Sequence, residues 1–140
     1  MAAILDDATT TVRPERGGRL LLDHDRLAIE DPAARHAALL DSDDATVVVG
    51  CIDDTVVGYA LAQLSVTANG HLCMIDELLV APQAQAIGVG SAMLEAVIGW
   101  AEARGCEAIE SQVLPGNRAA KNFFERLGMK TRKMRVSRDL

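Results

Sequence analysis

The stretch Leu78-Leu79-Val80-Ala81-Pro82-Gln83-Ala84-Gln85-Ala86-Ile87-Gly88-Val89-Gly90-Ser91 decides how this chain folds. An apolar run ends at a proline, a short polar turn follows, and two glycines open a long segment of apolar residues at helical spacing. This order predicts a strand, a tight loop and the start of a helix. The first N–H groups of a helix lack intrahelical partners and carry partial positive charge. Because glycine has no Cβ, an anion can approach the backbone closely, so this loop is expected to bind a phosphate or pyrophosphate.

The elements on either side of the loop predict a strand–helix–strand unit. The segment His71–Val80 is apolar on both faces, which is typical of a central strand that is covered on both sides. Helical spacing of apolar residues continues over Gly88–Arg104, and Gly105 is a natural stop. A second strand is expected over Cys106–Val113. The two strands are then parallel and joined by a right-handed crossover.

Upstream of this unit the sequence predicts a hairpin and two helices. The β-branched run Ala45–Ile52 pairs with Thr55–Val66 across an Asp-Asp turn, and Asn69-Gly70 marks the next turn. A helix over Pro32–Leu40 is expected to begin at Asp31, with aspartate as the N-cap and proline at the first helical position. Apolar spacing allows another helix within Glu15–Glu30.

The two ends of the chain have weaker patterns. Residues 1–8 are expected to be partly disordered, and Thr9–Arg13 is expected to be a short edge strand that stops at Pro14. After a last helix from Asn117 to Leu127, the alternating segment Met129–Leu140 is expected to complete the sheet as one or two strands. The fold class is therefore mixed α/β, with helices on both faces of the sheet.

Composition limits the kinds of function. A chain of 140 residues predicts one domain over 1–140, and its net charge of −6 argues against a nucleic-acid-binding protein. No apolar stretch is long enough for a transmembrane helix, and no signal peptide is recognisable, so a cytoplasmic protein without a membrane partner is expected. Three widely spaced cysteines suggest neither a disulfide framework nor a metal site.

Three kinds of phosphate-binding loop place glycines at the start of a helix. A P-loop requires a lysine after its last glycine, and none follows Gly90. A dinucleotide-binding fingerprint requires a third glycine, where this chain has Met93, and it expects a parallel neighbourhood instead of an antiparallel meander. The third loop fits the residues as they stand.

The run Gln85-Ala86-Ile87-Gly88-Val89-Gly90 resembles the Q/R-x-x-G-x-G/A acyl-CoA loop of the GNAT N-acetyltransferase superfamily. The segment Asn117–Met129 is similar to that family's last helix, with the pattern N-x-x-A-x-x-F-[YF]-E-x-L-G-[FM]. The resemblance covers about residues 31–140. It implies a GNAT-like, mostly antiparallel mixed sheet that splays at the cofactor strand, and transfer of an acetyl group from acetyl-CoA to an amine.

The resemblance also implies which residues hold acetyl-CoA. The end of the cofactor strand presents backbone groups to the pantetheine arm, the loop N–H groups bind the pyrophosphate, and the last helix closes the site. The implied cofactor-binding residues are Leu78, Leu79, Val80, Gln85, Ala86, Ile87, Gly88, Val89, Gly90, Ser91, Asn117, Ala120 and Phe124. No metal is implied.

Glu77 is the candidate general base, because this family often places a carboxylate just before the cofactor segment. Regular pleating would place Asp76 on the opposite face, so at most one of the two carboxylates is expected to face the cleft. His71 and His24 are weaker candidates, since a lone histidine is more often structural.

Phe124 stands where the family usually has a tyrosine that protonates the departing thiolate, and phenylalanine cannot donate a proton. Tyr59 is a possible substitute, although a packed aromatic is the commoner role. A non-catalytic or slow acyl-CoA-binding regulatory module is therefore the alternative to an enzyme. The acceptor is a small-molecule or peptidyl amine, and a homodimer is compatible with the family. Acidic residues would suit a cationic acceptor or simply a solvated surface: Asp23, Asp25, Asp41, Asp43 and Asp44.

Overall fold

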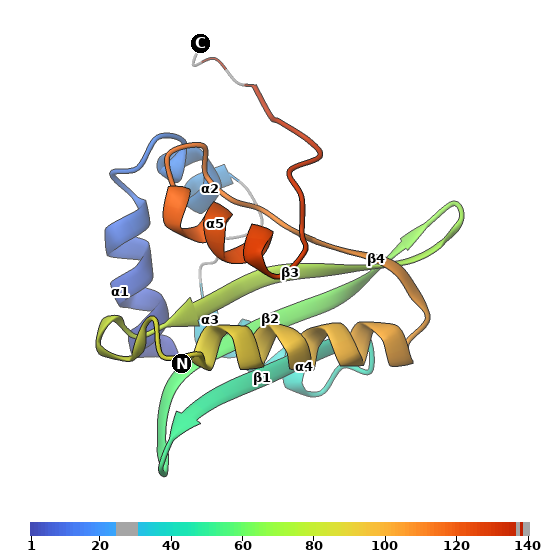
Figure 1. The fold of residues 1–140 in the computed structure, drawn as a ribbon, viewed down its shortest axis with the longest axis horizontal. Helices are drawn as coiled ribbons and strands as arrows, with labels where there is room; N and C mark the ends of the chain where they lie inside the picture. Colours follow the sequence, from blue (N-terminus) through green and yellow to red (C-terminus); the bar gives the residue numbers. More distant parts are fainter. Residues whose placement is uncertain (25–30, 137, 139–140) are drawn as a thin grey trace.

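A computed structural model describes residues 1–24, 31–136 and 138 of the protein. A four-stranded sheet with the order β1-β2-β3-β4 forms its centre, and the helices lie around it (Figure 1). The first three strands form an antiparallel meander, whereas β4 runs parallel to β3. In chain order the elements are α1 (Ala2–Val12), α2 (Gly18–His24), α3 (Pro32–Leu40), β1 (Ala45–Ile52), β2 (Thr55–Thr67), β3 (Gly70–Val80), the 3₁₀ turn η1 (Pro82–Ala84), α4 (Val89–Ala103), β4 (Cys106–Ser111) and α5 (Arg118–Arg126).

Helix α4 covers one face of the sheet and contributes to the main core. Its apolar residues pack on alternate residues of β2 and β3, as the period of two in a strand requires. The glycines of β1 and β2 allow this close approach, because a Cβ at Gly50 would lie 3.0 Å from the Met93 sulfur. The buried cluster consists of Ala60, Ala62, Cys73, Ile75, Met93, Leu94, Val97 and Ala101.

The opposite face of the sheet carries α3 and α1. Tyr59 and Leu61 are fully buried on this side, between the alternate residues of β2 that meet α4. Helix α3 begins as its sequence predicts, since the Asp31 carboxylate accepts a hydrogen bond from the Ala34 N–H at 3.0 Å. The mixed sheet with helices on both faces is thus confirmed.

The N-terminal prediction is wrong, because residues expected to be disordered or extended form α1. The residues Leu5, Ala8, Thr9 and Val12 recur at helical spacing and border a common cavity. The threonine hydroxyls donate to carbonyls one turn earlier, for example from Thr9 to the Asp6 carbonyl at 2.8 Å. Burial of this stripe therefore outweighs the β propensity of the threonines.

The C-terminal prediction is also wrong. Over residues 129–136 and 138 the structure describes no strand, and the segment runs away from the sheet (Figure 1). The apolar side chains Met134 and Val136 are 91% and 93% exposed, so little apolar burial offsets the entropy of ordering this basic segment. Lys133 reaches β4 only through its side chain, with Nζ 3.2 Å from a Glu110 carboxylate oxygen.

Two further boundaries differ from the sequence-based expectation. Strand β4 ends at Ser111, two residues before Val113. The helix expected within Glu15–Glu30 is observed from Gly18 to His24, and residues 25–30 lie outside the described residues.

Candidate active site

The sheet opens between β3 and β4. Pairing between these parallel strands ends at Ile75 and Ser111, whereas β3 continues to Val80 along β2. Residues 76–80 therefore have a paired edge toward β2 and no strand partner toward β4 within the described chain. This is the splay that the sequence resemblance implied, and it leaves the edge of Leu78–Val80 that faces away from β2 without a strand partner in the described chain, although the Val80 carbonyl accepts a hydrogen bond from the Gln85 side chain.

A cavity of about 150 Å³ occupies this opening. Five parts of the chain surround it: helix α1, helix α2, the residues of β3 from Asp76 to Leu79, the chain from Ser111 to Leu114, and helix α5 with its N-cap. Three of the expected cofactor-binding residues of α5 and its N-cap border it, namely Asn117, Ala120 and Phe124. Glu77, Leu78 and Leu79 border the same cavity, so the strand and the last helix meet at one site.

The glycine-rich loop forms the exposed start of α4. Ala86 and Gly88 have φ values of 63° and 94°, in the left-handed region, and Gly88 is the N-cap. The N–H groups of Val89, Gly90 and Ser91 begin the helix and so have no intrahelical acceptor. Residues 78–94 carry no charged side chain that would repel an anion. The side-chain amide of Gln85, one of the residues expected to bind the cofactor, donates a hydrogen bond to the Val80 carbonyl at 3.0 Å.

Helix α5 lies beside the start of α4. A Cβ at Gly90 would lie 3.3 Å from the Phe123 ring, so the second glycine allows the two helices to approach. At the start of α5, the Asn117 side-chain oxygen accepts a hydrogen bond from the Ala120 N–H at 2.9 Å. The loop and the Asn117–Gly128 motif are therefore adjacent in space, although about thirty residues separate them in the sequence.

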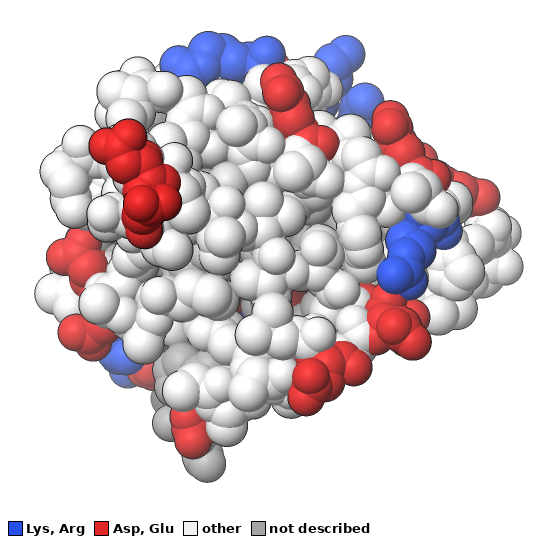
Figure 2. Space-filling model, turned by 90° about the horizontal axis from the view of Figure 1, so that it is seen from below, with Lys and Arg blue, Asp and Glu red and all other residues white. Residues whose placement is uncertain are grey.

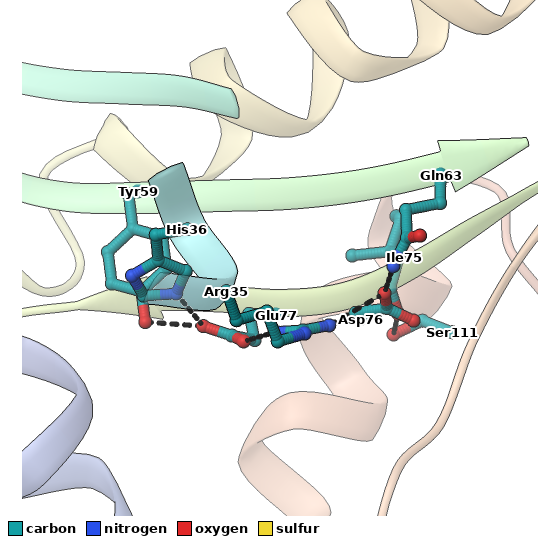
Figure 3. Close-up of polar contacts among 8 residues, drawn as sticks. All are labelled: Arg35, His36, Tyr59, Gln63, Ile75, Asp76, Glu77 and Ser111. Atoms are coloured by element: carbon teal, nitrogen blue, oxygen red, sulfur yellow. Dashed lines mark hydrogen bonds and ion pairs between the residues drawn. The ribbon is translucent and has the colours of Figure 1, made fainter. Parts of the chain in front are cut away.

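A β-bulge changes the expected direction of the Asp76 side chain. Leu61 lies opposite Glu77 and Ala62 opposite Ile75, so Asp76 is an extra residue in β3. Both carboxylates consequently contact α3, and their side chains are only 1% exposed (Figure 3). The expectation that regular pleating would separate them is wrong.

The Glu77 carboxylate is held by three side chains (Figure 3). Arg35 donates to Oε1, and the Tyr59 hydroxyl donates to Oε2 at 2.5 Å. The His36 ring nitrogen Nε2 lies 3.3 Å from the same Oε2. Hydrogen bonds of this kind to an ionised carboxylate are stronger than neutral ones. Glu77 thus borders the cavity while its oxygens are fixed from α3 and β2.

Tyr59 does not provide the missing proton donor. Burial, followed by the hydrogen bond to Glu77 and its charge, raises the pKa of Tyr59 far above its usual value, so the hydroxyl stays neutral and donates to Glu77. Phe124 borders the cavity without a polar group. Two hydroxyls border the cavity within the described residues, those of Thr9 and Ser111, and each already donates to a backbone carbonyl.

The other sequence candidates lie elsewhere. His71 is exposed near the start of β3, at the far end of the strand from Glu77. The side chain of His24 and the whole of Asp25 lie outside the described residues. Asp23 pairs with Arg13 at 3.0 Å, and the acidic residues 41, 43 and 44 are in the turn before β1. On the face shown in Figure 2, acidic side chains are scattered around an uncharged centre and form no single patch.

Sequence reasoning did not identify Arg35 and His36 as part of the site. They lie on a nine-residue helix, and their partners Asp76 and Glu77 are about forty residues further along the chain. No local pattern reports such a contact. The sequence offered one indirect signal, the adjacent acids Asp76 and Glu77 in an otherwise apolar central strand. Regular pleating would place one of the two in an apolar layer, so the pair indicates an irregularity such as a bulge.

The described residues contain neither a membrane-spanning helix nor a cluster of metal-binding side chains. No helix in that part of the chain has the length and apolarity needed to span a bilayer. No group of three or more histidine, cysteine, aspartate or glutamate side chains there is arranged to hold a metal ion.

The sheet opens between β3 and β4, a cavity occupies this opening, and a glycine-rich loop begins the next helix. These features place the chain in the acetyltransferase class of α/β proteins. The chain belongs to the acetyltransferase (GNAT) family, whose profile matches residues 10–129. It is 32% identical over 95 residues to the probable N-acetyltransferase camello of Xenopus tropicalis, covering 68% of this chain. The chain spans 43% of that relative, which is less than half of its length.

Solved structures share the fold. A tetramutant of the BH1408 protein from Bacillus halodurans superposes with a TM-score of 0.81 at 24% identity, covering 99% of this chain and 91% of that one. The aminoglycoside N-acetyltransferase AAC(6')-Iy in complex with CoA superposes with a TM-score of 0.66 at 20% identity, covering 76% and 74%. At such identities these structures establish the architecture of the chain.

Proposed function

We propose that this protein transfers an acetyl group directly from acetyl-CoA to a primary amine, carried by a small molecule or a peptide. The observation that supports this most directly is the convergence of three features at the open edge of β3. These are the cavity, the uncharged glycine-rich loop and the start of α5.

The dimensions of the site fit this donor. A cavity of about 150 Å³ is comparable to one that holds a benzene ring, and so accommodates an acetyl thioester. The remainder of the donor is far larger than the cavity and would lie along Leu78–Val80 toward the exposed loop. Its amide groups match the unpaired strand edge, and its pyrophosphate matches the N–H groups at the start of α4.

Different residues would carry out the separate chemical steps of the transfer. A backbone N–H of Leu78–Val80 would donate to the thioester oxygen as negative charge develops there, a contribution of about 2.7–4 kcal/mol in comparable sites. Glu77 would accept the proton that the amine loses as its nitrogen bonds to the acetyl carbon, directly or through one water. The carbon–sulfur bond breaks with its electron pair on sulfur.

The alternative is a protein that binds acyl-CoA without rapid turnover. Phe124 favours this alternative, because its ring cannot protonate the departing thiolate and the Tyr59 hydroxyl already donates its proton to Glu77. A thiol with a pKa near 8.5 is nevertheless a tolerable leaving group near neutral pH, so transfer does not require a donor.

Two measurements together distinguish these possibilities. The thermal shift caused by acetyl-CoA is measured first, and release of free CoA thiol is then followed over a panel of a polyamine, an aminoglycoside, a lysyl peptide and a simple alkylamine. We expect stabilisation by acetyl-CoA and amine-dependent thiol release. Stabilisation without thiol release would support the binding module, and an absence of both would reject the proposal.

A matched pair of glycine substitutions in α4 tests the loop. Gly90→Glu places a carboxylate at the proposed pyrophosphate site, against Phe123, and should abolish the acetyl-CoA thermal shift. Gly99→Glu adds the same charge to the same helix at a position with open space around it, and should preserve the shift. An undiminished shift in Gly90→Glu would show that the anion binds elsewhere.

A further inference from the structure

The bulge in β3 brings two carboxylates to one guanidinium group. Arg35 of α3 donates through Nη1 to Glu77 and through Nη2 to Asp76 Oδ2, the latter at 3.0 Å. The Arg35 side chain is 19% exposed, whereas both carboxylates are almost fully buried. Arg35 therefore contacts both acids of the bulge from one helix (Figure 3).

The charges in this cluster are unequal. With both acids ionised, Asp76, Glu77 and Arg35 sum to −1, and uptake of one proton by Glu77 makes the sum zero. Arg35 then remains paired with Asp76, so no buried charge is left alone when Glu77 is protonated. That matters because an uncompensated buried charge is strongly destabilising.

Two further side chains contact the Glu77 carboxylate within the described residues. The Tyr59 hydroxyl of β2 stays neutral. The His36 ring of α3 has its Nε2 3.3 Å from Glu77 Oε2. Gln63 of β2 donates to the same Asp76 oxygen as Arg35 and is uncharged. The residues of α1, α2 and α5 that border the cavity carry no charge. A carboxylate has about four acceptor positions, of which these donors use three on Glu77, leaving one on Oε1.

We propose that Arg35 is a positioning residue that holds Glu77 toward the cavity and, through its second contact with Asp76, allows Glu77 to take up and release the amine proton. The inference rests on the proposed function of Glu77. Asp76 is the counter-ion in this scheme, which explains why the strand carries two adjacent acids and a bulge that turns both the same way.

Two substitutions at this cluster should shift proton uptake in opposite directions. Arg35→Gln removes a cation that contacts Glu77 and leaves the neighbouring Asp76 in place, so the acid limb of the kcat–pH profile should move to higher pH. Asp76→Asn removes the anion that shares Arg35 with Glu77, so the limb should move to lower pH while kcat falls. Arg35→Lys should only partly restore the normal profile, because an ammonium group cannot bridge two carboxylates in the same planar way.

The same set of variants contains the controls for folding and for acetyl-CoA binding. Asp76→Asn is isosteric and can still accept from Gln63. If Arg35→Gln alone is unfolded, the double variant Arg35→Gln/Asp76→Asn removes one charge of each sign, and its acid limb should return toward that of the unmodified protein. All variants should keep the acetyl-CoA affinity. Arg13→Gln, which removes an exposed ion pair with Asp23, should leave the profile unchanged.

A second readout separates this inference from the proposed function. Carbon-13 NMR titration of labelled glutamate side chains follows proton binding to Glu77 without any substrate. Opposite shifts of the Glu77 midpoint in Arg35→Gln and Asp76→Asn would support the positioning role even if no amine is acetylated. Shifts in the same direction, or unchanged midpoints with a lower kcat, would overturn it.

Discussion

Asn117 caps helix α5, and we propose that it also binds the acetyl donor; a pair of substitutions can separate the two roles. Its side-chain oxygen caps α5 by accepting from the Ala120 N–H at 2.9 Å, while the residue borders the cavity. Since the oxygen is used by the cap, the NH₂ group is the part of the side chain that remains to donate to a carbonyl of the bound donor. Asn117→Ala removes both groups. Asn117→Asp keeps the capping oxygen and replaces the NH₂ group with a second acceptor.

The expected magnitudes follow from these contacts. Loss of the cap in Asn117→Ala should cost about 1 kcal/mol of stability. For a domain of this size that corresponds to a fall in Tm of about 3–5 °C. Asn117→Asp should keep the Tm or raise it slightly, because a carboxylate at a helix N-terminus is stabilised by about 0.3–1 kcal/mol.

Binding should respond differently from stability. A lost neutral hydrogen bond of about 0.5–1.5 kcal/mol raises the Kd of acetyl-CoA by about 2- to 13-fold. Asn117→Asp should reach the upper end of that range or exceed it, since its charge also repels an anionic ligand. Differential scanning fluorimetry measures the Tm, and isothermal titration calorimetry measures the Kd. If Asn117→Asp binds acetyl-CoA as tightly as the unmodified protein, Asn117 is only a helix cap and the reasoning is refuted.

Three further predictions concern packing, pH dependence and thiolate departure. Gly50→Ala should lower the free energy of unfolding by about 1–3 kcal/mol, because its Cβ would crowd Met93, whereas Gly99→Ala in open helical space should raise it by up to about 1 kcal/mol in urea denaturation. Burial raises the pKa of the Cys73 thiol from 9.0 to about 11, so the unfolded chain loses this proton at a lower pH than the folded protein does. The free energy of unfolding should therefore fall between pH 9 and 11, and it should fall less steeply in Cys73→Ala. Phe124→Tyr should raise kcat for thiol release at unchanged acetyl-CoA affinity, toward the lower end of the roughly 10²–10⁴-fold effect of a general acid, and an unchanged kcat would indicate that the thiolate leaves without a donor.

Sequence patterns predicted the central elements well where burial and local chemistry agree. The hairpin, the strand before the loop, helix α4 and the capped helices α3 and α5 lie close to the expected positions. Each has a strong apolar period together with a chemical start or stop signal, such as Asp31 or Asn117. At the N-terminus these signals conflicted, because β-branched threonines occupy a helix whose apolar stripe includes the buried Leu5 and borders the cavity.

The site was predictable only in part, for a similar reason. The loop and the α5 motif are local features of the sequence, and their residues were identified from it. The contacts of Arg35, His36 and Tyr59 with Glu77 join three separate elements, so they depend on how α3 is placed on the sheet.

Two levels of information are therefore distinct in this protein. Local order along the chain was enough to predict the glycine-rich loop, the strand before it and the distal helix, because turn chemistry, capping and apolar periodicity act over a few residues. The tertiary structure alone decided where β3 parts from β4 and on which side Asp76 lies. Both depend on strand register, and a single extra residue in β3 reverses the direction of a side chain without leaving a periodic trace in the sequence.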